Sequence, residues 1–495
     1  MSNALSARSP RPLSGLLAGL AEVVDDVAVH GLALDSRQVR EGDLFVALGG
    51  TRAHGGAYVD DAVAAGAVAV ASDAPLEARW PVPVIVIPGL DQQVGEIAAR
   101  FYDHPSAELR VVGVTGTNGK TSCTHLLAQA LSEPGTPCGL IGTLGNGLYG
   151  ALAPSTHTTP DAISLQRMLA VMKARGAGYA VMEVSSHGLD QGRVNGVAFE
   201  AALLTNLSRD HLDYHGDMAA YARAKRRLFE RPGLAWAVLN LDDELGRELV
   251  HSLPAGVRAL GYSLEGRNES GVDCLVAGEL RTDVAGLSFE VSGPWGKGRV
   301  DSPLLGRFNG ANLLGVLGVL LALDIPFDEA LDRLAGLRAP AGRMERFGGA
   351  GQPAVVVDYA HTPDALEQVL ATLAEHCRGA LWCVFGCGGD RDRGKRPAMA
   401  AAAERLADHL VITDDNPRHE DPEAIVHDIL AGLRQPHKAR VQRDRAAAIA
   451  EAVHGAAGDD VVLVAGKGHE DYQLVGDERR YFSDRETVET LLEAA

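Results

Sequence analysis

The chain has 495 residues, of which 46% are hydrophobic and 22% are charged. This length exceeds what one hydrophobic core serves and predicts about three domains. The 65 acidic residues outnumber the 46 basic ones, giving a formal net charge of -19. Nucleic acid and anionic membranes attract basic surfaces, so neither is expected as the main partner. An anionic ligand must therefore be held by a few locally placed cations and backbone N–H groups.

Neither the cysteines nor the apolar segments indicate export or membrane insertion. Six cysteines are scattered through the chain, and we expect reduced thiols, with Cys383 in a strand and Cys387 in a loop. No apolar segment of signal-peptide length follows Arg8 and Arg11, and the longest apolar run, 313–323, is too short to span a bilayer. We expect a cytoplasmic protein that does not insert into membranes.

The first 107 residues predict a small α/β domain without a catalytic cluster. Pro105 ends the preceding helical pattern and marks a linker. The predicted elements are strands at 44–48, 67–71 and 84–87 and helices near 58–65 and 94–102.

Residues 108–338 alternate strands and helices, which predicts a parallel sheet covered on both faces. Residues 271–301 instead alternate apolar and polar side chains between glycine turns, and predict an antiparallel patch in the same domain. Residues 339–495 repeat the strand-helix alternation and predict a second doubly wound domain. The predicted strands are 111–115, 180–184, 202–205 and 235–239 in the central domain, and 355–358, 381–385, 410–413 and 461–464 in the C-terminal one.

A glycine-rich turn follows the first strand of the central domain, with the sequence Gly116-Thr-Asn-Gly-Lys-Thr121. Gly116 and Gly119 permit a tight turn that aims backbone N–H groups at an anion. Lys120 would hold phosphate oxygens and the Thr121 hydroxyl a Mg²⁺ ion. Val114 stands where the usual phosphate loop has its first glycine, so this is a shortened relative of that loop. The alternative is a plain turn between a strand and a helix.

Polar clusters also follow the next two strands, where ligands of open α/β sheets bind. The run Met182-Glu-Val-Ser-Ser-His187 places Glu183 beside hydroxyls and an imidazole, which suit Mg²⁺ or phosphate. The next strand leads to His211 within a segment rich in Asp and His, which predicts a second metal position there. Structural loops capped by Asp and His are the alternative.

Lys225 lies in the middle of an apolar helical stripe. A lysine that faces inward has a lowered pKa, and the neutral amine can take up CO2 to form a carbamate. A lysine whose ammonium reaches back to solvent is the alternative, which helix geometry alone favours. The stripe consists of Met218, Tyr221, Ala222, Leu228 and Phe229.

Other polar residues predict contacts to nucleotide and substrate. Asn309 and Asn312 share one helical face and could read an adenine edge, although helix capping explains Asn309 equally well. Asp358 ends a strand, where a carboxylate commonly accepts ribose hydroxyls. In the C-terminal domain, Arg391 and Arg418 would bind carboxylates, and Asp415 and Glu470 an ammonium, as an amino-dicarboxylic substrate requires. A solvated charged rim is the alternative.

The sequence resembles the Mur ligases of peptidoglycan synthesis over essentially its whole length. The motifs that carry the resemblance are Gly116-Thr-Asn-Gly-Lys-Thr121, Met182-Glu-Val-Ser-Ser-His187, Asn206-Leu-Ser-Arg-Asp-His-Leu-Asp-Tyr-His-Gly216, Asp358-Tyr-Ala-His-Thr-Pro-Asp364, Asp415-Asn-Pro-Arg418 and Gly466-Lys-Gly-His-Glu470.

The resemblance implies three domains: a UDP-binding domain (1–107), a central P-loop ATPase-like domain (108–338) and a C-terminal Rossmann-like domain that binds the incoming amino acid (339–495). It favours a carbamylated Lys225. The implied catalytic residues are Lys120, Glu183, His211 and Lys225, and the implied metal ligands are Thr121, Glu183, His211 and the Lys225 carbamate. The implied ATP-binding residues are Gly116, Thr117, Asn118, Gly119, Lys120, Thr121, Ser122, Asn309, Arg343 and Asp358.

The resemblance also assigns the two other substrates. His157 stands where relatives often carry Asn, and Ala53-His-Gly-Gly56 where they usually show an Asp-Gly pair. Diaminopimelate differs from lysine by a second carboxylate, for which Arg418 supplies a cation. The residues implied for UDP-N-acetylmuramoyl-L-alanyl-D-glutamate are Leu34, Ser36, Thr51, Arg52, Ala53, His157, Thr158, Thr159, Ser185, Gln191 and Arg193. Those for meso-diaminopimelate are Arg391, Asp415, Asn416, Pro417, Arg418, Gly466 and Glu470.

The implied reaction is an ATP-dependent amide ligation through an acyl phosphate, with Mg²⁺ as cofactor and the chain as a monomer. Two alternatives stay open. A folylpolyglutamate-type or lysine-adding ligase shares the phosphate loop. A nucleotide-gated binding module would hold or hydrolyse ATP without forming an amide.

Overall fold

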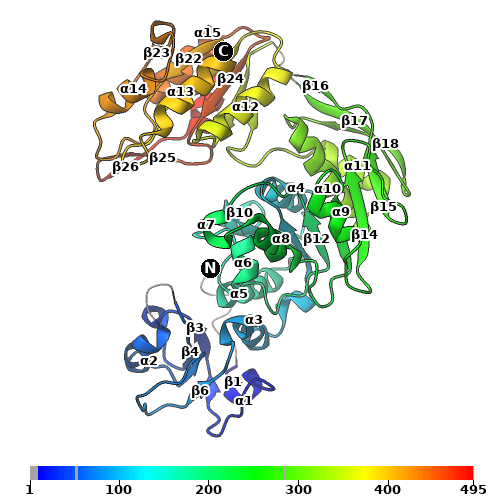
Figure 1. Ribbon diagram of the computed structural model, residues 1–495, viewed down its shortest axis with the longest axis vertical. Coiled ribbons are helices and arrows are strands. Elements are labelled where there is room, and N and C mark those ends of the chain that lie inside the picture. The colour runs from blue at the N-terminus through cyan, green and yellow to red at the C-terminus, as the bar shows by residue number, and fades with distance from the viewer. Residues whose placement is uncertain (1–8, 51–53, 284, 350, 494–495) are drawn as a thin grey trace. The chain divides into compact units, whose positions relative to one another are not determined.

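The computed structural model describes residues 9–50, 54–283, 285–349 and 351–493. The chain forms two compact units, the first comprising Met1–Gly261 with Glu269–Val272 and the second Tyr262–Asn268 with Asp273–Ala495. Figure 1 traces the chain through both. Among the described residues no helix has the length and apolar character needed to cross a bilayer. All six cysteines are free thiols.

The N-terminal sheet is parallel, with the order β3-β4-β5-β6. Its strands present alternate side chains to two clusters: Leu44 and Val46 pack with α1 and α3, and Phe45 and Ala47 with α2. The three predicted strands and both helices are confirmed, and β3 was missed. The elements are α1 (Leu13–Leu16), β3 (Gly31–Ala33), β4 (Asp43–Ala47), α2 (Val59–Ala64), β5 (Ala69–Ser72), β6 (Val84–Val86) and α3 (Leu90–Phe101).

The central sheet runs β10-β9-β8-β11-β7-β12-β13-β14, and β8, β11, β7, β12 and β13 are parallel. Their carboxyl ends therefore share one edge, as predicted. The strands are β7 (Arg110–Thr115), β8 (Cys138–Gly142), β9 (Gly145–Leu148), β10 (Ala151–Ala153), β11 (Tyr179–Glu183), β12 (Ala201–Leu204), β13 (Trp236–Asn240) and β14 (Arg258–Ser263). The helices are α4 (Lys120–Leu131), α5 (Ala162–Ala174), α6 (Ser186–Asp190), α7 (Leu212–His215), α8 (Met218–Arg226) and α9 (Glu244–Val250).

The antiparallel patch predicted at 271–301 exists as β15 (Asp273–Ala277), β16 (Arg281–Asp283), β17 (Gly286–Gly293) and β18 (Gly296–Ser302). By contacts, its strands from Asp273 onward fall in the second compact unit. The domain limits at 107 and 338 stay predictions. Helices α10 (Arg307–Ala322) and α11 (Phe327–Ala335) follow.

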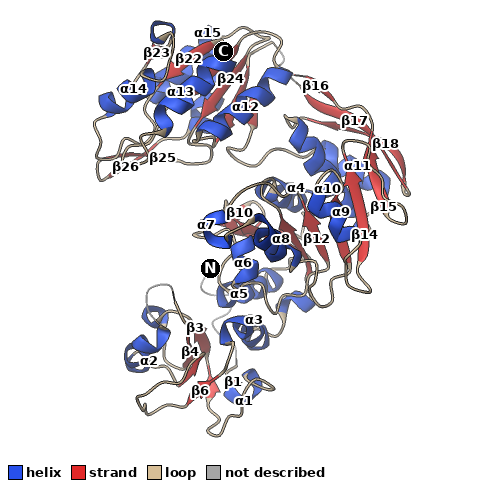
Figure 2. Cartoon of the chain, viewed as in Figure 1, coloured by secondary structure: helices blue, strands red, loops and turns tan. Residues whose placement is uncertain are grey.

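The C-terminal sheet has the order β19-β20-β24-β21-β22-β23 and is covered on both faces (Figure 2). One face packs on α12, α13 and α14, the other on α15 and α16. This is the predicted doubly wound arrangement. The elements are β19 (Glu345–Gly348), β20 (Ala354–Asp358), α12 (Pro363–His376), β21 (Leu381–Phe385), α13 (Lys395–Leu406), β22 (His409–Ile412), α14 (Pro422–Leu430), β23 (Arg440–Val441), α15 (Arg445–Gly455), β24 (Val461–Ala465), the hairpin β25 (Tyr472–Val475) and β26 (Glu478–Tyr481), and α16 (Asp484–Glu493).

A buried ion pair fixes the last helix to this sheet. Arg445, at the start of α15, donates to Asp484 from Nε at 2.7 Å and from Nη2 at 2.8 Å, and Nη2 also reaches the Ala465 carbonyl oxygen at 3.0 Å. Both charged side chains are almost fully buried. Removing one partner leaves the other charge buried without compensation.

We therefore expect Arg445→Ala to lower the free energy of opening of α16 by about 3–5 kcal/mol. Native-state hydrogen exchange at the α16 amides measures it. The control is Arg440→Ala, because Arg440 pairs with Glu451 on the surface at 3.0 Å, where such pairs contribute about 1 kcal/mol or less. Equal effects of the two substitutions would contradict the argument.

Candidate functional site

The glycine turn after β7 has the geometry of an anion-binding loop. Gly116 has a φ of +150°, and a Cβ there would lie 1.8 Å from the Thr205 hydroxyl, so only glycine fits. Gly119 adopts the left-handed conformation directly before α4. The N-terminus of α4 therefore opens at the edge where the parallel strands end, and it favours negative charge.

Two lysines converge on one backbone oxygen of this loop. Lys120 donates to the Gly116 carbonyl oxygen at 2.9 Å, and Lys225 of α8 donates to the same oxygen at 2.7 Å. Lys225 is only 1% exposed, and its amine lies 4.5 Å from the centre of the Tyr221 ring. The Tyr221 hydroxyl in turn lies 3.1 Å from Thr117 Oγ1. The alternative of a lysine reaching solvent is therefore wrong.

This environment keeps the Lys225 amine neutral. Burial, and secondly the charge of Lys120, lower its pKa to about 6, and the carboxylate of Asp210 only partly opposes them. Burial also lowers the pKa of Lys120. At neutral pH, Lys225 therefore presents a lone pair beside the phosphate loop.

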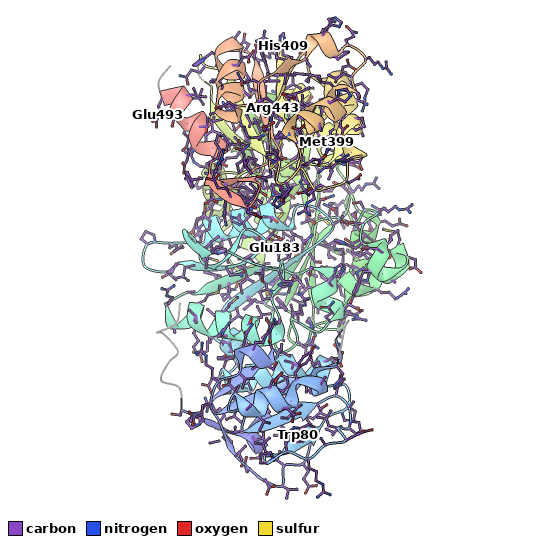
Figure 3. The ribbon with its side chains drawn as sticks, turned by 90° about the vertical axis from the view of Figure 1, so that its left-hand side faces the viewer. Trp80, Glu183, Met399, His409, Arg443 and Glu493 are labelled. Carbon is purple, nitrogen blue, oxygen red and sulfur yellow. The ribbon has the colours of Figure 1, made fainter. Side chains whose placement is uncertain are left out.

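Glu183, at the end of β11, joins the phosphate loop to the adjacent loop. Its carboxylate accepts from the Thr121 hydroxyl at 3.0 Å and from the Thr143 N–H at 2.8 Å. Burial raises the pKa of Glu183, while the Thr143 N–H and the Lys120 charge act against that rise. Figure 3 labels Glu183 among the central strands. A buried carboxylate facing a hydroxyl supplies the hard oxygen donors that Mg²⁺ selects, so these residues fit the ion.

The predicted metal ligands do not form a complete shell by themselves. Within the parts of the chain that the structure describes, no three His, Cys, Asp or Glu side chains are grouped as metal ligands. His211 lies in a ring cluster, 5.0 Å from His187 and 6.0 Å from Tyr221 between ring centroids. A shell built on Glu183 and His211 needs further oxygens, such as nucleotide phosphates or a carbamate.

Four of the eleven residues predicted for the UDP-muramoyl dipeptide form one hydrogen-bonded chain. Thr159 Oγ1 donates to the Glu183 carbonyl oxygen at 3.0 Å and lies 3.1 Å from Ser185 Oγ. Arg193 donates to the Thr159 carbonyl oxygen at 2.7 Å and to Gln191 Oε1 at 2.6 Å. This chain begins at the same strand end as the Glu183 carboxylate.

The remaining residues of that prediction are more scattered. Thr158 Oγ1 lies 3.1 Å from Thr143 Oγ1, whereas the exposed His157 contacts Thr156. Leu34 and Ser36 lie half-buried just after β3. Thr51, Arg52 and Ala53 lie outside the described residues.

The C-terminal cluster contains a lysine that the sequence reasoning missed. Lys467 is fully buried, and its ammonium lies 3.2 Å from Glu470 and 3.8 Å from Asp415 and donates to Asn416 Oδ1 at 3.3 Å. Gly466, beside it, has a φ of +118°. The run from Gly466 to Glu470 signalled a site, but two flanking glycines remove any periodicity that would show the lysine facing inward.

Arg418 is held in a set orientation beside this cluster. Its backbone has a φ of +52°, fixed by its N–H donating to the Leu474 carbonyl oxygen at 3.0 Å and by its own carbonyl accepting from Gly476 at 2.7 Å. Its Nη1 donates to the Gly389 carbonyl oxygen at 2.8 Å, which leaves other guanidinium donors available. Arg391 is exposed, and Pro417 is buried next to Arg418.

The other residues predicted to contact the nucleotide make hydrogen bonds or ring contacts within the protein. Asp358 accepts from the Met344 N–H at 2.8 Å, and burial raises its pKa. The Arg343 guanidinium lies 5.0 Å from the centre of the Tyr359 ring. Asn309 is not a helix cap, because Gly306 holds that position. Its side chain donates to the Leu305 carbonyl oxygen and accepts from Asn312.

Family models match the chain in three consecutive segments. The Mur ligase family catalytic domain matches residues 28–102, the Mur ligase middle domain 114–320, and the Mur ligase glutamate ligase domain 342–468. Together they cover most of the chain. The chain belongs to the Mur ligase family and has its three-domain α/β fold.

Two relatives and one solved structure with high sequence identity share one name. The chain is 55% identical over 476 residues to the UDP-N-acetylmuramoyl-L-alanyl-D-glutamate--2,6-diaminopimelate ligase of Alkalilimnicola ehrlichii, covering 94% of this chain and 95% of that one. It is 49% identical over 470 residues to the Coxiella burnetii protein of that name, with 94% and 96% covered. A solved structure of such a ligase matches with a TM-score of 0.78 and 39% identity over 98% of this chain and 99% of that one. A folylpolyglutamate synthase of Mycobacterium tuberculosis, 20% identical with a TM-score of 0.57 over 74% of this chain and 91% of that one, shares the fold alone.

The lowered pKa of Lys225 predicts a pH-dependent stability. Between pH 6 and the ordinary lysine value of 10.5, the unfolded chain binds a proton at this site and the folded chain does not. The free energy of unfolding therefore rises with pH in that window, by up to about 1.4 kcal/mol per pH unit from this group. We expect wild type to gain melting temperature relative to Lys225→Met between pH 6 and pH 9, in buffers free of CO2. The exposed Lys297→Met is the control, and parallel profiles for wild type and Lys225→Met would contradict the prediction.

Proposed function

We propose that this chain uses ATP to join diaminopimelate to UDP-N-acetylmuramoyl-L-alanyl-D-glutamate, which makes it a UDP-muramoyl-tripeptide synthetase of peptidoglycan synthesis. The observation that carries the proposal is the likeness, above 50% identity over nearly the full length, to a ligase of that name. The phosphate loop supplies the ATP side, and the cluster around Arg418 supplies polar groups of both signs for an amino acid with two carboxylates. The reaction takes place in the cytoplasm, with the chain as a monomer.

The central-domain residues activate the acceptor carboxylate. The loop N–H groups and Lys120 hold the ATP phosphates, so that negative charge on the transferring γ-phosphoryl group is balanced. Thr121 and Glu183 would hold Mg²⁺, which supplies further charge neutralisation when bound. The chain from Thr159 to Arg193 orients the dipeptide. Its terminal carboxylate oxygen attacks the γ-phosphorus, ADP leaves, and an acyl phosphate forms.

The amine of diaminopimelate then completes the ligation. It attacks the acyl carbon, the tetrahedral intermediate loses inorganic phosphate, and the amine proton leaves to solvent. Asp415 and Glu470 attract the substrate ammonium that does not react, and Arg418 the distal carboxylate. Lysine lacks that second carboxylate and would leave Arg418 without its partner, which explains a preference for diaminopimelate.

Lys225 has the properties that carbamate formation requires. Its neutral amine attacks CO2, an N–C bond forms, and the ammonium proton passes to water. The carbamate nitrogen retains one hydrogen, which can still donate to the Gly116 carbonyl oxygen. The new carboxylate places negative charge beside Lys120, and it would supply an oxygen to a second Mg²⁺ together with the Glu183 carboxylate and the His211 imidazole nitrogen.

For Lys225→Ala we expect loss of ligation by at least about 100-fold in kcat, because the carbamate oxygens are removed from a buried charged site. Short-chain carboxylic acids should restore part of the rate by supplying a carboxylate to the vacated space. Steady-state phosphate release measures both effects. Full activity in the unrescued variant would end the carbamate proposal.

For Arg418→Ala we expect the KM for diaminopimelate to rise roughly 10- to 100-fold, as loss of a charge-assisted hydrogen bond implies. The KM for ATP should change little, because the phosphate loop is untouched. Arg434→Ala, which removes an arginine outside the site, is the control. Equal increases in both KM values would refute the role of Arg418 in recognising diaminopimelate.

The direct test is product mass analysis with ATP, the UDP-muramoyl dipeptide and a panel of amino acids. We expect one tripeptide product, with diaminopimelate, and one phosphate released per amide formed. Preference for lysine would support the lysine-adding alternative. Phosphate release without any amide product would support the alternative of a nucleotide-gated binding module that hydrolyses ATP without ligation.

A further inference from the structure

A cavity of about 960 Å³ in the first compact unit lies outside the sites described above. It is bounded by the edge strand β3 and the loop after it, by the end of α3, by β9 and by one side of α5. None of the residues predicted for ATP or for the muramoyl dipeptide is among the described residues that line it. Its volume falls in the range of sites for small organic molecules.

The lining is basic, although the chain as a whole carries a net charge of -19. Arg37, Arg40, Arg167 and Arg175 face the cavity together with His30. Among the described lining residues Asp43 is the only acid, and its carboxylate already accepts the Arg40 backbone N–H at 2.9 Å. A concave surface of one sign focuses the field and attracts the opposite charge.

Three of these arginines have guanidinium groups available for a ligand. Arg37 is paired with Asp35 at 2.6 Å. In contrast, the side chains of Arg40, Arg167 and Arg175 make no ion pair or hydrogen bond with any described residue. Arg167 and Arg175 belong to the same side of α5, two turns apart, and Arg175 follows its last residue. Unpaired guanidinium groups at a cavity wall match phosphate oxygens, which accept from both arms of the fork.

Apart from the polar Gln38 and Asn146 and two glycines, the rest of the lining is apolar or aromatic. Phe101 and Tyr102 end α3, and Leu148, Met168 and Met172 complete this surface. Phe101 and Tyr102 pack edge to face, with ring centroids 5.0 Å apart. Such a surface favours a flat or ring-shaped body rather than a free inorganic ion, since burial of apolar area adds to the attraction of charge.

We propose that this cavity is a second ligand site, which binds a small aromatic phosphate with its phosphate on the arginines of α5 and its ring on Phe101 and Tyr102. The site is physically connected to the catalytic centre. Asn146 of β9 lines the cavity, and its Oδ1 accepts from the Gly142 N–H at 3.1 Å. The next residue, Thr143, donates its N–H to Glu183 at 2.8 Å.

The test uses pyridoxine 5′-phosphate, a fluorescent aromatic phosphate without an aldehyde that could react with lysines. Binding is measured by equilibrium dialysis on the full chain, first without other ligands and then with ADP and the UDP-muramoyl dipeptide at saturating concentration. We expect saturable binding of one equivalent. Pyridoxine, which lacks the phosphate, should bind at least about 10-fold more weakly, as loss of a charge-assisted contact implies.

Charge reversal locates the site. The double variant Arg167→Glu/Arg175→Glu changes two exposed side chains and should weaken binding at least about 100-fold. Arg79→Glu, which changes an exposed arginine outside the cavity, should bind like wild type. Phenylglyoxal labelling of the wild-type chain gives an independent measurement: the probe should protect Arg167 and Arg175 but not Arg79.

Three results would overturn the inference. The first is that the probe shows no saturable binding at millimolar concentration. The second is that the double variant binds the probe as well as wild type does, and that the probe does not protect Arg167 and Arg175. The third is that the UDP-muramoyl dipeptide displaces the probe. The last result would assign the cavity to the substrate site. Ligation is measured separately, so failure here leaves the proposed function standing.

Discussion

The site depends on one backbone oxygen that accepts hydrogen bonds from two lysines. Because both amines reach the Gly116 carbonyl, at 2.9 Å for Lys120 and 2.7 Å for Lys225, they lie too close for both to be charged in a buried place without cost. Burial lowers the pKa of both amines, and for Lys225, whose side chain belongs to a residue only 1% exposed, the pKa falls to about 6. The loop thus has a neutral Lys225 amine beside Lys120. Gly116 itself must be glycine, because any Cβ would meet Thr205.

Glu183 connects the phosphate loop by hydrogen bonds to the loops beside it at the edge of the sheet. Its carboxylate holds Thr121 and the Thr143 N–H, while its backbone carbonyl holds Thr159 and so the chain that ends at Arg193. The parallel register of β7 and β11 places Val114 opposite Glu183, so the glycine loop after β7 and the segment from Ser185 to Arg193 start from neighbouring strand ends. In the proposed function, this placement presents an acceptor carboxylate and a γ-phosphate to each other without a separate scaffold.

Much of the fold was predictable, because runs of β-branched residues indicate strands and apolar residues at helical spacing indicate helices. The predicted strands, such as 381–385, coincide with the observed ones to within two residues. The strand Cys138–Gly142 was missed, since two of its five residues are glycines and only its buried neighbours make it extended. The inward direction of Lys225 was visible from helical periodicity. That of Lys467 was not, because loop residues have no period. Arg396 shows a related limit. At the start of α13 it is fully buried and donates to Glu420 and Asp428, two partners whose pairing only the tertiary structure sets.

The central claim, that a neutral Lys225 is converted into an anionic oxygen donor beside the phosphate loop, has a direct spectroscopic test. The chain is equilibrated with isotopically labelled bicarbonate at slightly alkaline pH, and the carbonyl region of its carbon NMR spectrum is compared with that of Lys225→Ala. The account predicts one carbamate resonance in the wild-type chain, absent from the variant and sharpened by ADP with Mg²⁺. Identical spectra for the two chains, with wild type fully active, would contradict it.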